Sequence, residues 1–157
     1  MARWVTLIRQ SLERALENDE RVVIIGEDIE SPYGGAFKVT QGLSHRFPVG
    51  VRNTPISESL IVGLGNGLAL AGMGPVCEIM FVDFITLAAD QLINSASKFR
   101  FMYNDQVQVP LIVRTPMGGR RGYGPVMGRL TASRLRSISW VCLICRCWQL
   151  TLELVRA

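Results

Sequence analysis

Three side chains have the clearest potential for chemistry: one glutamate and two apolar residues. Glu58 follows the strand-like segment VRNTPI and begins a glycine-rich helical pattern. A carboxylate there can stabilise the helix dipole by about 0.3–1 kcal/mol, or it can act as an acid at a ligand site. Met80 and Phe84, in EIMFVDF, can line an apolar pocket at a strand end, or they can be core residues. The residue types alone leave both alternatives open.

Four glycines lie in the helical pattern that begins at Glu58, namely Gly63, Gly65, Gly67 and Gly72. Each glycine lowers the stability of a helix by roughly 1 kcal/mol relative to alanine. Because of this loss, we expect a packing or binding requirement for small residues at these positions. Either a cofactor or a partner helix approaches closely, or the helix packs tightly on a sheet. The spacing differs from the dinucleotide-binding fingerprint, whose glycines lie in a loop before the helix.

Residues that could bind a metal ion are few. His45, the only histidine, lies between polar residues of a short amphipathic segment and is expected at the surface. Cys142, Cys145 and Cys147 form a C-x-x-C-x-C pattern, but a zinc site requires four ligands and the sequence has no second pair. We therefore predict no metal site in this chain.

Strand and helix patterns alternate along the chain up to Pro116. Short apolar runs predict buried strands in RVVIIGED, VRNTPI, PVCEIMF and VPLIVRTP. Helical periodicity predicts helices over residues 3–18, 39–47, 57–74 and 85–103, and Ser57 is a candidate N-cap. The side chains expected to face inward are Val5, Ile8, Leu12, Ala15 and Leu16 in the first helix and Leu87, Ala88, Leu92 and Ile93 in the last. This alternation predicts an α/β fold, a parallel sheet with helices on both faces.

Ligands of such sheets bind beyond the carboxyl ends of the strands. Those ends carry GED, TPISES, EIMFVDF and RTPMGG here. The predicted fold therefore places Glu58, Met80 and Phe84 at the ligand-binding edge.

The composition indicates one domain of 157 residues with a net charge of +4. Residues 1–125 hold twelve basic and twelve acidic side chains, whereas residues 126–157 hold five arginines and one glutamate. An excess confined to one end of the chain differs from the basic face of a nucleic-acid-binding domain. No apolar run reaches the ~18–20 residues of a membrane span, and the acidic N-terminal segment resembles no secretory or transit peptide. We expect a cytoplasmic protein that binds neither nucleic acid nor membrane.

Several segments together resemble a known family. They are GEDIESPYGGAFKVTQGL, VRNTPISES, GLGNGLALAGMGPVCEIMF, DQLINSASKFRFMYN and VPLIVRTPMGGRRGYGP. In this order they resemble the β subunit of 2-oxoacid dehydrogenases of the pyruvate, branched-chain and acetoin types, within its transketolase-like pyrimidine-binding domain. The resemblance predicts a partial domain of this kind over residues 1–125.

The resemblance implies a cofactor, thiamine diphosphate, shared with an α subunit that binds the diphosphate and magnesium. Glu58 then hydrogen-bonds the ring nitrogen of the aminopyrimidine, and Met80 and Phe84 flank that ring. The implied reaction is oxidative decarboxylation of pyruvate or a related 2-oxoacid, with acyl transfer to a lipoyl carrier protein. The implied assembly contains two α and two β subunits.

The sequence departs from the family pattern after Pro125. The family continues GYGPTHSQ, with an active-site histidine, whereas this chain continues GYGPVMGRL. A shift of reading frame explains the arginines, the cysteines and the lost periodicity of residues 126–157. We therefore expect this tail to be a frameshift product and the domain to be incomplete at its C-terminal end, with this chain inactive by itself.

Two other interpretations remain open at this point. The polypeptide can be a non-catalytic remnant that at best binds an α subunit. It can also be a fragment of a transketolase or deoxyxylulose-phosphate synthase, which the position of residue 1 near the start of the pyrimidine domain disfavours.

Overall fold

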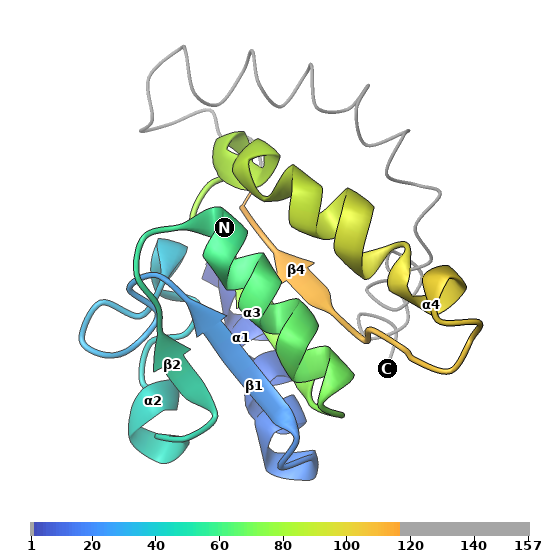
Figure 1. The fold of residues 1–157 in the computed structure, drawn as a ribbon. Coiled ribbons are helices and arrows are strands. Elements are labelled where there is room, and N and C mark those ends of the chain that lie inside the picture. The colour runs from blue at the N-terminus through green and yellow to red at the C-terminus, as the bar shows by residue number, and fades with distance from the viewer. Residues whose placement is uncertain (1, 117–157) are drawn as a thin grey trace.

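The computed structural model describes residues 2–116, so the predictions for the tail, residues 126–157, and its cysteines lie outside the described residues. Four strands alternate with helices and short helical turns (Figure 1). The strands are β1 Val22–Gly26, β2 Val51–Asn53, β3 Gly74–Glu78 and β4 Ile112–Arg114. The helical elements are α1 Ala2–Asn18, η1 Ala36–Lys38, α2 Leu43–Arg46, α3 Glu58–Leu70, η2 Val82–Ala88, η3 Gln91–Ala96 and α4 Phe99–Met102.

The strands form one parallel sheet in the order β2-β1-β3-β4. The central pair, β1 and β3, is aligned along five residues, from Val22 opposite Gly74 to Gly26 opposite Glu78. Side chains of β1 alternate between the two faces, since successive residues of a strand point to opposite sides. This arrangement confirms the predicted parallel α/β fold.

Each face of the sheet is covered by helices, as predicted. On one face, Val23 and Ile25 of β1 join the buried residues of α3 in a core that also includes Ala88 and Ala96. On the other face, Ile24 packs with residues of α1 and α2. Figure 1 shows α3 in front of the sheet and α1 behind it.

Helix α3 begins where the sequence predicts. The side chain of Ser57 caps it by accepting a hydrogen bond from the backbone N–H of Leu60 at 3.4 Å. Gly65 faces the sheet, where a Cβ atom would lie 2.4 Å from the sulfur of Cys77. Tight packing on the sheet therefore explains Gly65. It does not explain Gly67, where a Cβ atom would meet nothing within 4 Å.

Three of the predicted helices differ from the expectation. The pattern over 39–47 forms only the four-residue helix α2, Leu43–Arg46. The pattern over 85–103 forms a 3-10 turn, a π turn and a short α-helix in succession rather than one regular helix. Because such turns change the number of residues per turn, they rotate side chains away from the expected face. Leu87 is 60% exposed and Ile93 is 42% exposed, contrary to the prediction, although Ala88 is buried. In α1, Ile8 is also 38% exposed.

Other expectations concern absences and surface position. Within residues 2–116, no helix has the length and apolar character needed to cross a bilayer. The same residues contain no group of three or more side chains suited to hold a metal ion. His45 is exposed, as the sequence predicts.

Candidate functional site

The carboxyl ends of the four parallel strands meet at one edge of the sheet. Each strand is followed there by a polar residue or contributes one as its last residue: Glu27 after β1, Thr54 after β2, Glu78 at the end of β3 and Arg114 at the end of β4. This edge is the position at which open α/β sheets bind ligands. The site below is built from these residues and from the N-terminus of α3.

Glu58 is the first residue of α3 and is only 8% exposed. Its place follows from the chain direction, because four residues connect the end of β2 to the start of α3, which runs back along the sheet. Within the described residues, no hydrogen-bond donor reaches its carboxylate. Because the described residues supply no donor to it, this carboxyl group can accept or share a hydrogen bond with a bound group at the edge.

Glu27 is a second buried carboxyl group at this edge, 7% exposed. Burial raises its pKa, and the negative charges of Glu58 and then Asp28 raise it further. The influence of Glu58 shows that the two buried carboxyl groups lie close enough to interact. Glu27 was not among the sequence-predicted site residues, although the GED segment that contains it was identified as one of the strand ends at the ligand edge.

Glu78 and Arg114 form an ion pair across the ends of β3 and β4, where their Cα positions are aligned. The side chains are 2% and 16% exposed respectively. The closest contact joins Oε2 of Glu78 to Nη1 of Arg114. Neither atom has a hydrogen-bond partner, so the contact is electrostatic and not a hydrogen bond.

Buried polar atoms without hydrogen-bond partners concentrate at this edge. Six occur in the described part of the chain, and five of them belong to residues at or just after strand ends: Thr54 Oγ1, both carboxylate oxygens of Glu78, Arg114 Nη1 and Thr115 Oγ1. Glu78 Oε2 and Arg114 Nη1 contact each other as an ion pair, whereas each of the other atoms carries a desolvation cost of about 1–3 kcal/mol. The edge is therefore suited to receive polar groups that residues 2–116 do not supply.

Met80 and Phe84 lie in the segment that follows β3. Met80 is half-buried two residues beyond the strand, whereas Phe84 lies in η2 and not at a strand end. Phe84 packs against the buried cluster that contains Ile61 and Ile79, and its ring meets that of Phe81 edge-on at 6.3 Å. Because η2 also contacts α3, Phe84 belongs to the same face of the sheet as that helix. The joint pocket of both residues with Glu58 stays a prediction.

Comparisons with known proteins give relatives of one kind. The chain is 40% identical over 117 residues to the 2-oxoisovalerate dehydrogenase subunit beta of Bacillus subtilis, covering 74% of this chain and 36% of the relative. It is 40% identical over 116 residues to the mitochondrial pyruvate dehydrogenase E1 component subunit beta of Homo sapiens, covering 73% and 32%. It is 34% identical over 130 residues to the acetoin:2,6-dichlorophenolindophenol oxidoreductase subunit beta of Cupriavidus necator, covering 75% and 38%.

The chain thus spans about a third of the length of these relatives. Residues 1–128 match the family described as the transketolase pyrimidine binding domain. The matched region includes the whole described sheet and the buried carboxyl groups at its edge. Because this match covers most of the sequence, the chain belongs to the family of transketolase pyrimidine-binding domains.

Proposed function

We propose that this chain is the pyrimidine-binding part of the β subunit of a thiamine-diphosphate-dependent 2-oxoacid dehydrogenase. The observation that carries the proposal is Glu58: an 8% exposed carboxyl group at the ligand edge, without a hydrogen-bond donor among the described residues. It lies in the TPISES segment on which the family resemblance rests. The three relatives described above, all β subunits of oxidoreductases that act on 2-oxoacids or acetoin, support the same assignment.

The residues present fit the aminopyrimidine half of thiamine diphosphate. Glu58 would hold a proton against the ring nitrogen, and Met80 and Phe84 would flank the ring with apolar surface. When bound, the cofactor supplies a carbon nucleophile and an electron sink for decarboxylation of a 2-oxoacid. The unpaired polar atoms of Thr54 and Thr115 support this fit, because they lie at the same edge.

The chain's own contribution to proton transfer comes from the buried pair of Glu27 and Glu58. Two neighbouring carboxyl groups in a poorly hydrated place resist double ionisation. Burial and the Glu58 charge raise the pKa of Glu27. Glu27 would therefore keep its proton to a higher pH than an exposed glutamate does, next to the Glu58 carboxyl group that is proposed to face the ring nitrogen.

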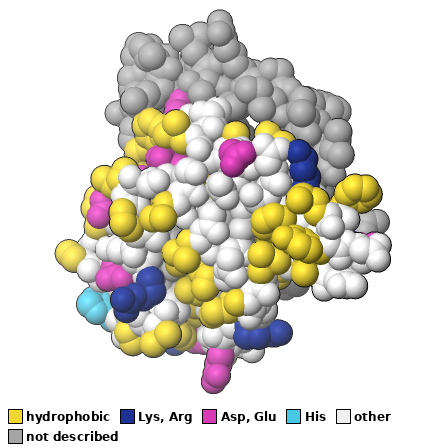
Figure 2. Space-filling view, viewed as in Figure 1, with side chains coloured by type: hydrophobic (Ala, Val, Ile, Leu, Met, Phe, Trp, Pro, Cys, Tyr) yellow, Lys and Arg dark blue, Asp and Glu magenta, His cyan; other side chains and the backbone are white. Residues whose placement is uncertain are grey.

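An α subunit completes the proposed site. It would bind the diphosphate and magnesium, in an assembly of two α and two β subunits that passes the acyl group to a lipoyl carrier protein. Several apolar side chains on the α3 side of the molecule support such a partner, namely Ile56, 80% exposed, Leu60, 46%, Leu64, 44%, and Leu87, 60%. Figure 2 shows hydrophobic side chains gathered at the surface on this side. We propose pyruvate or a related 2-oxoacid as substrate and the cytoplasm as location.

The test is cofactor binding by the chain together with an α subunit of the family. Calorimetry should detect magnesium-dependent binding of thiamine diphosphate to the complex and little binding to the chain alone. Glu58→Gln should weaken binding to the complex, and the matched control Glu20→Gln, at an exposed position far from the edge, should not.

Two outcomes would contradict the proposal. Equal binding by the Glu58→Gln and Glu20→Gln complexes would remove Glu58 from the site. A complex that assembles with the α subunit but binds no cofactor would favour a non-catalytic partner of that subunit.

A further inference from the structure

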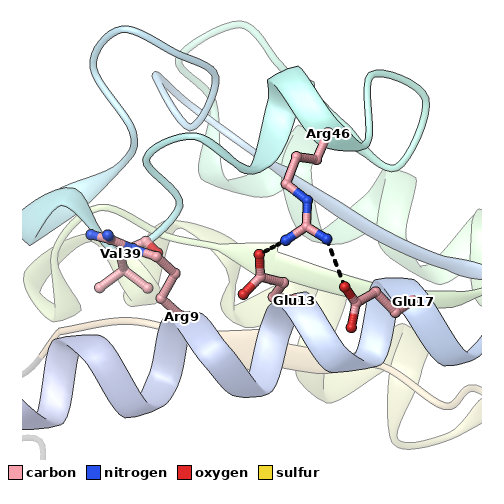
Figure 3. Close-up of polar contacts among 5 residues, drawn as sticks. All are labelled: Arg9, Glu13, Glu17, Val39 and Arg46. Atoms are coloured by element: carbon pink, nitrogen blue, oxygen red, sulfur yellow. Dashed lines mark hydrogen bonds and ion pairs between the residues drawn. The ribbon is translucent and has the colours of Figure 1, made fainter.

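Helix α1 is attached to the loop that follows β1. We define the glycine loop as residues 28–42, which lead from the end of β1 to α2. The Arg9 side chain donates a hydrogen bond through Nε to the Val39 carbonyl at 3.2 Å and a second, through Nη2, to the Lys38 carbonyl. Figure 3 shows Arg9 reaching from α1 toward this loop. One guanidinium group thus holds two successive backbone carbonyls.

The two residues before Val39 adopt a backbone conformation that is unfavourable for side chains. Phe37 has φ 59° and Lys38 has φ 62°, both in the left-handed region. Non-glycine residues remain in this region only where the surrounding structure holds them. Arg9 binds the carbonyl of one of these residues and the carbonyl that follows it, so it supplies such a restraint from outside the loop.

Hydrogen bonds within the loop connect the Arg9 contact to the start of the loop. Thr40 donates its N–H to the Gly34 carbonyl at 3.0 Å and its hydroxyl to the Ile29 carbonyl at 2.8 Å. Gly35 donates its N–H to the Asp28 carbonyl at 2.9 Å. These hydrogen bonds connect residues 38–40 to Asp28, which directly follows the buried Glu27.

The inner side of the loop lies directly on the ligand edge. A Cβ atom on Gly35 would be 2.9 Å from Oε1 of Glu78 and 2.8 Å from the hydroxyl of Thr40. No side chain fits in this space, so the backbone of the loop packs on the buried Glu78 carboxylate. The loop is held between Arg9 on the outside and Glu78 on the inside.

We propose that Arg9 is a positioning residue, which fixes the glycine loop over the carboxyl edge and so keeps water away from Glu27. This inference rests on the proposed function in one respect, which is that the carboxyl edge is the side that binds the cofactor. Arg46 provides the comparison: it binds Glu13 and Glu17 of the same helix, but through a half-exposed ion pair that holds α2 and not the loop carbonyls (Figure 3).

The experiment compares the full chain with its Arg9→Gln, Arg9→Lys and Arg46→Gln variants. Hydrogen exchange measures the exchange rates of the Gly35 and Thr40 amides, which donate hydrogen bonds within the loop. The exchange rate of the Ile24 amide in β1 is the reference. Carbon-detected NMR titration reads the Glu27 carboxyl group.

Arg9→Gln should accelerate exchange of the loop amides at least tenfold relative to Ile24. It should also lower the pKa of Glu27 toward its usual range, because a displaced loop lets water in while the charges of Glu58 and Asp28 remain. Arg9→Lys, which keeps a single charged donor, should give an intermediate result. Arg46→Gln should leave the loop amides and the Glu27 titration unchanged.

Three results would overturn the proposal. One is equal exchange in Arg9→Gln and Arg46→Gln; another is a uniform acceleration that includes Ile24. The third is an Arg9→Gln variant in which the loop amides exchange faster but the pKa of Glu27 is unchanged. These measurements use the chain alone, so their failure is distinct from a failure of the cofactor-binding test, which uses the complex.

Discussion

At the scale of single residues, the ligand edge combines charges that a core normally avoids. Glu27, Glu58 and Glu78 are each less than 9% exposed, and only Glu78 has a cationic partner, Arg114, among the described residues. Burial of a carboxylate without compensation favours its protonated form. Burial and the charges of Glu58 and Asp28 raise the pKa of Glu27, whereas Glu78 contacts the cation of Arg114.

Glu27 should make the stability of the chain depend on pH. Its folded pKa lies above the usual value of 4.5, so its contribution to stability is present below about pH 4.5 and is lost as pH rises through the folded pKa. Glu27→Gln should remove this decline and make the chain more stable at neutral pH. Urea unfolding across a pH series measures the effect.

The matched control for that series is Glu20→Gln, which changes an exposed glutamate. A decline with pH that is identical in wild type and in Glu27→Gln would show that Glu27 does not carry the raised pKa.

Breaking the Glu78–Arg114 pair should be costly. Arg114→Met leaves a 2% exposed carboxylate without its cation, and loss of one partner from a buried pair typically costs about 3–5 kcal/mol. The double variant Glu78→Met with Arg114→Met should recover most of this loss, since neither charge then remains buried. Chemical unfolding of the single and double variants gives the coupling. Single losses that simply add in the double variant would contradict the ion-pair interpretation.

At the scale of elements, periodicity located the strands and α3 well but not the regularity of the last helical region, residues 85–103. The β-branched run VVII predicted β1, and Ser57 predicted the start of α3, because both signals are local. The turns between Val82 and Met102 were not predictable from apolar spacing, since that spacing assumes a regular helical pitch and these turns change the pitch. Glu27 was missed for a related reason: its proximity to Glu58 joins segments thirty residues apart, which no local pattern contains.

The two central glycines of α3 should respond in opposite directions to alanine. Gly65→Ala places a methyl group 2.4 Å from the Cys77 sulfur and 2.8 Å from Leu111, so it should destabilise the chain by about 1–3 kcal/mol through overpacking. Gly67→Ala enters open space and should stabilise the helix by up to about 1 kcal/mol. Thermal unfolding of both variants measures this contrast. A stabilised Gly65→Ala variant would contradict the close packing of α3 on the sheet.

At the scale of the whole molecule, several exposed apolar side chains lie on the α3 side of the sheet (Figure 2). Leu60 and Leu64 lie one helical turn apart on α3 and are both nearly half exposed. Contiguous apolar surface of this kind marks interaction sites in soluble proteins. The molecule therefore presents its ligand edge and an apolar helix side to the same proposed partner.

Leu64→Glu should prevent association with an α subunit of the family while leaving the fold intact. The side chain is 44% exposed, so a charge there is hydrated in the free chain but would be buried in the complex. Co-purification with the α subunit measures assembly, and circular dichroism measures the fold. Leu70→Glu is the control, because Leu70 is also 44% exposed but points to another side of α3. Equal loss of assembly in both variants would contradict the proposed contact side.

The parallel order of the strands has a consequence for biosynthesis. Ile24 of β1 pairs with Val51 of β2, and Val22 of β1 pairs with Gly74 of β3. The first neighbour of β1 is therefore synthesised 27 residues later and the second 52 residues later. At translation rates of about 5–20 residues per second, β1 stays without its second neighbour for roughly 3–10 s after it leaves the ribosome. During that interval one edge of β1 has no neighbouring strand, so an unpaired apolar strand edge is exposed to other chains until β3 has been synthesised.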